Sequence, residues 1–386
     1  MTILVKPITA CNLKCSYCFQ NDQKTSGNYT NKKDYDMQAI LGSMREMNSI
    51  SGGLQVLHGG EILLMPIPDL EILLSESLRL NGFSAIQTNG VLIQPEHIEL
   101  FEKYNTSISV SCDGPNRLNR ARSNGSVSNT DKTTETIHEN IAKMINRGIQ
   151  VGVISVISKL HADKESRDMF HDWILKLDAM GVAGGRMNLL QSNEPLTQEM
   201  FQMTNAQARE FYCDTAQWLL DYPHLNWDPF REIVDNLLGL GNKNCVYEEC
   251  DPLSTVSVLE ILSNGEMANC SKLAFDGVPF LANDVQPVSS IRYEILSRID
   301  QKNGGCMDCK YWSICHGHCP GDAVDGDWRR KTRFCETWYG LYDFYYRYLK
   351  ALNSSLVLKV DKTDASNKTD TDQELASYMR KKIFAG

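Results

Sequence analysis

The sequence predicts an α/β protein, in which a partial (β/α)6 barrel of the TIM type is followed by a small cysteine-rich domain. Short apolar runs alternate with amphipathic stretches through the first half of the chain, as in βα units around a parallel sheet. Eight of the 13 cysteines lie between Cys245 and Cys335, so the second half has a different character. Polar motifs directly follow several predicted strands, where sites on barrels of this kind lie.

Six βα repeats are too few for a closed eight-unit barrel and suit an open one. The predicted strands are Ile3–Lys6, Leu54–His58, Ala85–Thr88, Ser107–Ser111, Val151–Val156 and Arg186–Leu190. The predicted helices between them are Met37–Met47, Asp69–Leu80, Glu96–Tyr104, Thr134–Asn146 and Lys164–Met180.

The length of 386 residues corresponds to about two domains. We expect a barrel over residues 1–200, a helical linker over 201–244, a cysteine-rich domain over 245–352, and a polar linker with a short helix over 353–386. Outside the barrel, the predicted helices are Asn205–Leu220, Pro229–Leu238, Trp338–Leu352 and Glu374–Ile383.

The net charge of −9 argues against nucleic acid as the main partner, because phosphate binding needs a basic surface. No apolar run approaches the roughly 18 residues of a membrane span. The first residues, MTILVKP, lack the apolar stretch of a signal peptide. We therefore expect a cytoplasmic protein that binds neither membranes nor nucleic acid.

Cysteines in such number are unusual for a reduced cytosolic chain, and an odd count cannot pair fully as disulfides. Cys11, Cys15 and Cys18 form C-x3-C-x2-C after the first predicted strand. Three thiolates can hold three irons of a [4Fe–4S] cube and leave the fourth iron open. A zinc site is the alternative at this stage.

With Phe19 after it, the triplet resembles the signature of the radical S-adenosylmethionine (radical SAM) superfamily. The resemblance implies that the open iron binds the amino and carboxylate groups of SAM. It also implies reductive cleavage of SAM to methionine and a 5′-deoxyadenosyl radical. Gly59, Gly60 and Glu61 follow the second strand and resemble the GGE motif of the family. Glycines allow close approach of the backbone, and the carboxylate can accept a hydrogen bond from the SAM amino group.

Two further motifs end the third and fourth strands. QTNG at residues 87–90 and SCDGP at residues 111–115 resemble stretches of peptide-modifying radical SAM enzymes. The resemblance implies that Asn89 and Ser111 contact polar groups of SAM.

Three more side chains are assigned by resemblance or left between two roles. Arg122 matches the arginine that pairs with the SAM carboxylate, and Arg120 is the competing choice. Tyr17 either packs on the adenine of SAM or belongs to the core.

The remaining cysteines form C-x14-G-x4-C and C-x2-C-x5-C-x3-C, followed by one more cysteine, a pattern that resembles the SPASM domain of peptide-modifying radical SAM enzymes. The resemblance implies two fully ligated auxiliary [4Fe–4S] clusters and thus three clusters in all. The inner cluster set is Cys245, Cys250, Cys270 and Cys319. The outer cluster set is Cys306, Cys309, Cys315 and Cys335. Zinc sites remain the alternative. Two cysteines, Cys112 and Cys213, belong to none of these sets, and we expect them to be inert packing residues.

The hypothesis for function is an oxidoreductase that abstracts a hydrogen atom from a precursor peptide made by the ribosome. The product would be a crosslink, a thioether, an epimer or an oxidised residue. A flavodoxin- or ferredoxin-type protein would supply electrons. Asp322, Asp325 and Asp327 are candidates for the catalytic acid or base, with solvated loop carboxylates as the alternative.

Three other functions stay open. An anaerobic sulfatase-maturating enzyme would make formylglycine. Relatives of that type carry an aspartate directly after the cysteine that matches Cys270, whereas this chain has Ser271 and Lys272 there. A small-molecule dehydrogenase of antibiotic biosynthesis would more often have a truncated cluster domain. A non-enzymatic iron–sulfur or zinc protein would not need the open iron beside GGE. The sequence does not indicate the oligomeric state.

Overall fold

The computed structural model of the chain describes residues 2–18, 33–192, 194–241, 245–247, 250, 258–273, 291–361 and 370–384. The chain divides into two compact units. The first unit comprises Met1–Gln202 and Val258–Gln286, and the second comprises Met203–Ser257 and Pro287–Gly386. In the described parts of both units, no helix is long and apolar enough to cross a lipid bilayer.

The first unit contains a parallel sheet that confirms the predicted α/β fold. Its strands follow the order β6-β5-β4-β3-β2-β1-β8-β9. The six predicted strands are all present and pair in parallel with their neighbours in sequence. Their bounds are β1 Thr2–Val5, β2 Leu54–Leu57, β3 Ser84–Thr88, β4 Thr106–Ser111, β5 Val151–Ile157 and β6 Gly185–Leu189.

Two strands from the cysteine-rich half of the sequence extend this sheet, which the sequence analysis did not predict. β8 (Val258–Ile261) pairs in parallel with β1, with Thr2 opposite Val258. β9 (Met267–Asn269) then pairs with β8 in antiparallel orientation. The first unit is therefore built from two separate stretches of chain.

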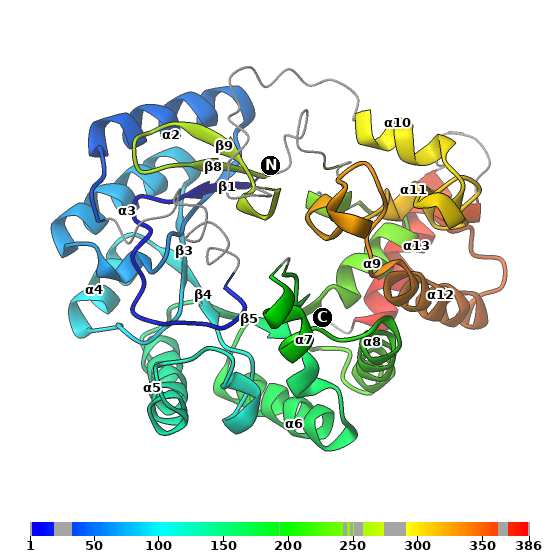
Figure 1. Ribbon diagram of the computed structural model, residues 1–386, viewed down its shortest axis with the longest axis horizontal. Helices are drawn as coiled ribbons and strands as arrows, with labels where there is room; N and C mark the ends of the chain where they lie inside the picture. The colour runs from blue at the N-terminus through cyan, green and yellow to red at the C-terminus, as the bar shows by residue number, and fades with distance from the viewer. Residues whose placement is uncertain are drawn as a thin grey trace. The chain divides into compact units, whose positions relative to one another are not determined.

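Helices cover the outside of this sheet (Figure 1). Their bounds are α2 Met37–Ser51, α3 Ile67–Asn81, α4 Pro95–Lys103, α5 Val127–Asn146 and α6 Lys164–Met180. A further short helix of the first unit is α7 Pro195–Phe201. Side-chain caps fix several of the starts. Asp36 accepts a hydrogen bond from the N–H of Ala39 over 3.0 Å at α2. Ser126 caps α5 in the same way, so that helix begins earlier than its apolar periodicity predicts.

The core of the first unit lies between the strands and these helices. Ile108 of β4, Leu73 of α3, Ile141 of α5 and Ile174 of α6 are fully buried there. Along β5, residues alternate between buried and half-buried positions, as expected when successive side chains point to opposite faces.

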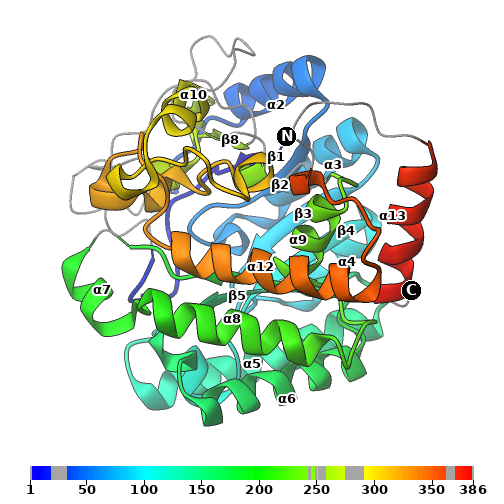
Figure 2. The ribbon, with the colours of Figure 1, turned by 90° about the vertical axis from the view of Figure 1, so that its right-hand side faces the viewer.

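The second unit is mainly helical. Its elements are β7 Trp227–Asp228, α8 Asn205–Leu219, α9 Phe230–Leu237, α10 Ile291–Arg298, α11 Trp312–Cys315, α12 Cys335–Leu352 and α13 Asp370–Ile383. α8 and α12 lie side by side (Figure 2). At this contact, a Cβ on Gly340 would come within 2.5 Å of Arg209 Nε. α13 is held by an ion pair of 2.6 Å between Arg380 Nε and Asp235.

Candidate functional site

The strand ends of the first unit surround a cavity of about 380 Å³. Its walls bring together, with one exception, the first three cysteines and the predicted SAM contacts, which come from separate motifs. These are Cys11, Cys15, Tyr17, Cys18, Gly59, Gly60, Glu61, Asn89, Ser111 and Arg122. Phe19, the other residue of that selection, lies outside the described residues.

The loop with the three cysteines is held in place by backbone hydrogen bonds. The N–H groups of Lys14 and Ser16 each donate over 2.8 Å, to the carbonyls of Ser123 and Ala121. Burial raises the pKa of the Cys15 thiol to about 12. Such thiols stay protonated near neutral pH, and binding to a metal would release the protons.

The two glycines after β2 allow this loop to lie against the sheet. A Cβ on Gly60 would come within 2.2 Å of the Ala10 carbonyl oxygen and 2.3 Å of the Thr9 oxygen. Gly59 has a φ of +150°, a backbone conformation that residues with a side chain rarely adopt. The Gly60 N–H donates to the carbonyl of Ile8 over 2.9 Å. The glycines are therefore required by the segment that leads into the cysteine loop.

Glu61 is almost completely buried, at 2% exposure, and its carboxylate accepts three hydrogen bonds. Thr88 Oγ1 donates over 2.6 Å, the Asn89 N–H over 2.7 Å and the Leu63 N–H over 3.1 Å. Burial raises the pKa of this carboxyl, while the hydrogen bonds from Thr88, Asn89 and Leu63 oppose the shift. The side chain thereby links the end of β2 to the end of β3.

Asn89 connects the same strand end to the cysteine loop. Its Nδ2 donates to Asn12 Oδ1 over 2.7 Å and lies 3.9 Å from Cys11 Sγ. The Leu13 N–H also donates to that sulfur, over 3.4 Å. Cys11 is thus oriented from two directions.

Tyr17, Asp113 and Arg122 form a buried polar cluster beside the cysteine loop. The Tyr17 hydroxyl donates to the Asp113 carboxylate and accepts from Arg122 Nη1 over 3.2 Å. Tyr17 also packs against Ala121 and Leu190. Arg122 Nε is buried without a hydrogen-bond partner among the described residues. A guanidinium with an unused donor at the cavity wall suits an anionic ligand group. Arg120 instead forms an exposed ion pair with Asp131.

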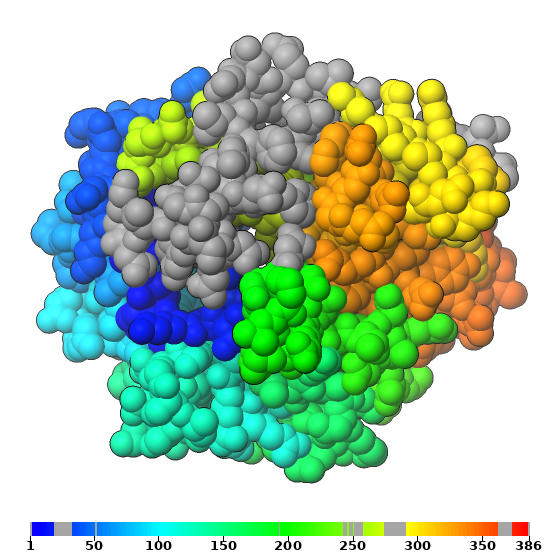
Figure 3. Space-filling model, viewed as in Figure 1, coloured from blue at the N-terminus to red at the C-terminus, as the bar shows by residue number. Residues whose placement is uncertain are grey.

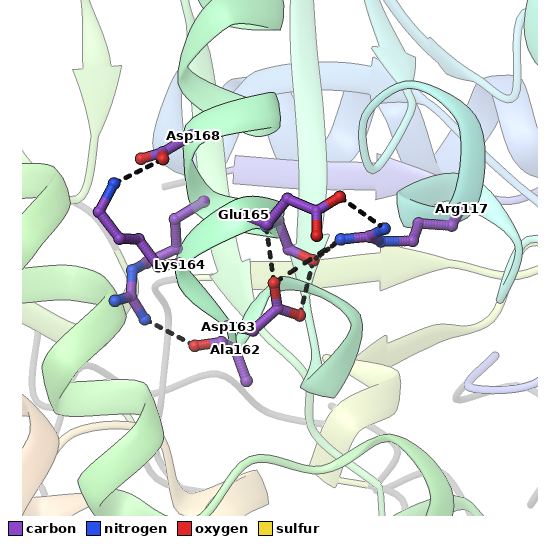
Figure 4. A network of polar contacts seen from close by, with 8 residues as sticks. Arg117, Ala162, Asp163, Lys164, Glu165 and Asp168 are labelled. Carbon is purple, nitrogen blue, oxygen red and sulfur yellow. Dashed lines mark hydrogen bonds and ion pairs between the residues drawn. The ribbon is translucent and has the colours of Figure 1, made fainter.

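The segment that carries Ser111 and Arg122 is fastened to α6 by a polar network (Figure 4). Arg117 donates to Glu165 over 3.1 Å and to Ser166 Oγ over 3.0 Å. Asp163 caps α6 through the N–H of Ser166 over 2.9 Å.

A buried ion pair lies where β8 meets β1. Lys6 Nζ is 2.7 Å from Glu260 Oε1 and donates to Ser271 Oγ over 2.5 Å. The Ser271 N–H donates to the same Glu260 oxygen over 2.7 Å. Glu260, Cys270 and Lys272 all line the cavity, so this network holds Cys270 at its wall.

The four cysteines of the outer cluster set line one small cavity of the second unit. They share it with the aromatic side chains of Tyr311, Trp312, Tyr339 and Tyr342. Lys331 lines the same cavity. The residues present therefore fit a group that is bound by four thiolates.

The other predicted site residues lie as follows. Of the inner cluster set, Cys270 belongs to the first unit, and Cys245, Cys250 and Cys319 belong to the second. Asp322 is buried, whereas Asp325 and Asp327 form ion pairs with Arg330 and Arg329 over 2.5 and 2.8 Å. Cys112 is fully buried and Cys213 is half-buried.

The geometry of the thiols bears on the choice between iron–sulfur clusters and zinc. Within the described ranges, no three His, Cys, Asp or Glu side chains converge closely enough to hold a single metal ion. A [4Fe–4S] cube places each thiolate on a separate iron and thus spreads its ligands. A cluster therefore needs thiols that are more widely spaced than the ligands of a single ion.

Several cavity residues were not selected from the sequence. Thr88 lies within the QTNG motif, so its hydroxyl could have been considered. Glu260 is an acid inside an apolar run, which is itself a signal of a buried partner. Arg186 and Asn188 of β6 and Lys272 also line the cavity, and nothing in their local sequence marks them.

Comparison with known proteins gives a family for the first unit. Residues 5–173 match the model of the radical SAM superfamily. A radical SAM cyclopropyl synthase, TigE, from Paramaledivibacter caminithermalis is 24% identical to this chain. The match covers 81% of this chain and 66% of TigE, so this chain spans just under two thirds of the length of that relative. A serine-type anaerobic sulfatase-maturating enzyme from Bacteroides thetaiotaomicron is 21% identical over 82% of each chain.

Solved structures show the same fold. The structure of native anSMEcpe with bound AdoMet and the Cp18Cys peptide has a TM-score of 0.69 at 15% identity, and the match covers 91% of this chain and 98% of that one. SuiB of Streptococcus suis, bound to its precursor peptide SuiA, has a TM-score of 0.59 at 17% identity over 87% of this chain and 75% of that one. The chain therefore carries a radical SAM domain, formed by residues 5–173.

Proposed function

We propose that this protein matures a peptide made by the ribosome by abstracting a hydrogen atom from it. One observation carries the proposal. A single cavity collects Cys11, Cys15 and Cys18 from one loop, and Glu61, Asn89, Ser111 and Arg122 from four other positions along the chain. Two structurally similar proteins were solved with a peptide bound, which supports a peptide as the substrate.

Each group of residues has a distinct task in this proposal. Cys11, Cys15 and Cys18 would hold a [4Fe–4S] cluster with one open iron, and Glu61, Asn89, Ser111 and Arg122 would hold SAM. Bound together, the cluster and SAM supply a one-electron cleavage that yields methionine and a 5′-deoxyadenosyl radical. Glu61 accepts a hydrogen bond from the amino group, and the Arg122 guanidinium pairs with the carboxylate. The buried walls exclude water from the reacting atoms.

The outer cluster set, and Cys270 with the other three cysteines of the inner set, would bind two auxiliary [4Fe–4S] clusters. With every iron ligated, these clusters would transfer electrons rather than bind SAM. A flavodoxin- or ferredoxin-type protein would be the donor. The predicted boundary of the cluster-binding domain at residues 245–352 is part of this proposal.

The test uses the full chain, reconstituted anaerobically with iron and sulfide. Short peptides encoded next to the gene are supplied with SAM and dithionite, once unlabelled and once with deuterium on the α-carbons and the side chains. The proposal predicts deuterium in 5′-deoxyadenosine and a change in peptide mass. Cleavage of SAM without deuterium transfer from any such peptide would contradict the assignment of a peptide substrate.

Formylglycine formation is a second candidate, favoured by one observation. Sulfatase maturases place an acid after the cysteine that corresponds to Cys270, and here Ser271 stands there. The Glu260 carboxylate accepts hydrogen bonds from the N–H and the hydroxyl of Ser271 and lines the same cavity. A peptide with a sulfatase cysteine or serine distinguishes the two functions, because only a sulfatase maturase would convert it to an aldehyde that reacts with a hydrazine probe.

A further inference from the structure

The second unit contains a buried cation to which the proposed reaction assigns no role. Arg292, in the first turn of α10, is only 1% exposed. Burying a charge is unfavourable unless hydrogen bonds or opposite charges compensate it. α10 lies beside the segment of residues 310–330, shown in yellow and orange in Figure 3.

Backbone carbonyls provide most of this compensation. The guanidinium of Arg292 donates to five of them, which is the full hydrogen-bonding capacity of its planar fork. Nε donates to Trp328 over 2.7 Å, Nη1 to His318 over 2.9 Å and His316 over 3.3 Å, and Nη2 to Arg330 over 3.0 Å and Gly317 over 3.1 Å.

Three of these acceptors are consecutive residues with left-handed backbone conformations. The φ angles of His316, Gly317 and His318 are +51°, +77° and +59°. Residues with a Cβ rarely adopt this conformation, and it persists only where the surroundings hold it. Arg292 binds all three carbonyls, so it supplies contacts that hold the loop between Cys315 and Cys319.

The loop that Arg292 holds begins directly after a predicted cluster ligand. The carbonyl of His316, the residue that follows Cys315, accepts a hydrogen bond from Arg292 over 3.3 Å. Burial lowers the pKa of Arg292, and the thiols that oppose this shift are those of Cys250, Cys319, Cys306 and Cys315. The cation thus lies near cysteines of both predicted auxiliary sets.

We propose that Arg292 is a positioning residue that holds the loop between Cys315 and Cys319 and raises the reduction potential of the auxiliary cluster bound by Cys315. The inference rests on the proposed function, because it requires the auxiliary clusters. A fixed positive charge favours the reduced cluster, which carries one more electron.

The test measures the potential, which a merely structural role would not change. The full chain carries Cys11→Ala, Cys15→Ala and Cys18→Ala, so that only auxiliary clusters are observed. Dithionite supplies the electron, and electron paramagnetic resonance follows reduction against applied potential. Iron is counted in each sample. Into this background are placed Arg292→Gln, Arg292→Lys and the control Arg298→Gln. Arg298 lies on the same helix with 78% of its side chain exposed.

We expect about eight irons in the background and in all three variants. Arg292→Gln should lower the equilibrium constant for reduction of the cluster about tenfold. For a one-electron couple this is a shift of the reduction potential by about 59 mV to more negative values. Arg292→Lys, which keeps the charge, should stay closer to the background, and Arg298→Gln should match it. An unchanged potential in Arg292→Gln with full iron content would overturn the inference.

Loss of iron is also decisive. If Arg292→Gln loses iron and Arg292→Lys keeps it, the potential of Arg292→Lys decides, because a value near that of the background supports the electrostatic role and a value about 59 mV more negative overturns it. If both lose iron while Arg298→Gln keeps it, the site needs the shape of the guanidinium, and the electrostatic role is wrong. A background chain without iron would instead overturn the proposed auxiliary clusters, and this inference with them.

Discussion

The carboxylate of Glu61 accepts a hydrogen bond of 2.7 Å from the backbone N–H of Asn89, and this contact joins the ends of β2 and β3 at the cavity. The Asn89 side chain in turn binds Asn12 in the cysteine loop over 2.7 Å. Three motifs that are far apart in the sequence are thereby coupled. A substitution in one of the three motifs should therefore disturb the contacts of the other two.

Replacing Glu61 with glutamine tests this coupling. The amide of glutamine has one acceptor oxygen instead of two, so at least one of the three donors to Glu61 would lose its partner. We expect the free energy of unfolding to fall by about 1–3 kcal/mol and SAM to bind more weakly. Urea denaturation and equilibrium binding of SAM measure the two effects. Glu71→Gln, at a half-buried position of α3 that pairs with Lys103 and does not line the cavity, is the matched control and should leave SAM binding unchanged.

Replacing Gly60 with alanine tests the close approach of the cysteine loop. The added Cβ would lie 2.2 Å from the Ala10 oxygen, so the segment before Cys11 must shift. We expect loss of iron from the first cluster site while the auxiliary sites keep theirs. Gly42→Ala is the control, because nothing lies within 4 Å of its Cβ, and in a helix it should be neutral or stabilising. Iron content equal to that of the control would contradict this explanation of the glycine.

The Lys6–Glu260 pair predicts a non-additive effect on stability. Lys6→Met leaves a buried carboxylate without its cation and should lower the free energy of unfolding by about 3–5 kcal/mol. Lys6→Met combined with Glu260→Leu removes both charges and should be less destabilising than Lys6→Met alone. Urea denaturation of the two single variants and the double variant gives the coupling. Additive effects would mean that the ion pair contributes little.

His58 predicts a pH dependence of stability. Burial, with the nearby charge of Lys6, lowers the pKa of this imidazole to about 3 from an ordinary value near 6.5. Between these values the unfolded chain binds a proton that the folded chain does not, so folding weakens as pH falls from 6.5 towards 3. His58→Gln should remove this contribution to the pH dependence. The difference in the free energy of unfolding between wild type and His58→Gln should therefore change between pH 6.5 and 3.

Urea denaturation across the window measures the difference. His224→Gln, at an exposed position, serves as the control. A constant difference between wild type and His58→Gln at all pH values would show that His58 titrates normally.

The sequence predicted elements and motifs whose signals are local. Alternation of apolar runs located β1 to β6, and the position of each motif after a strand implied that Glu61, Asn89 and Ser111 meet at one edge of the sheet. The pairing of β8 with β1 was missed because it depends on contacts between segments far apart in the chain.

The role of Arg292 could not be predicted for a different reason. Its partners are backbone carbonyls, which every residue has, so no pattern of side chains marks the contact. The left-handed conformations of His316 and His318 likewise have no sequence signal, because such conformations favour glycine or asparagine.

The central claim is that Cys11, Cys15 and Cys18 hold a cluster that cleaves SAM. The most direct measurement is an iron count together with an assay for 5′-deoxyadenosine, after anaerobic reconstitution and addition of SAM and dithionite. We predict about 12 irons per chain and formation of 5′-deoxyadenosine. The triple alanine variant at these cysteines should hold about 8 irons and form none, while Cys213→Ala should match the wild type. Bound zinc, or iron without cleavage of SAM, would contradict the claim.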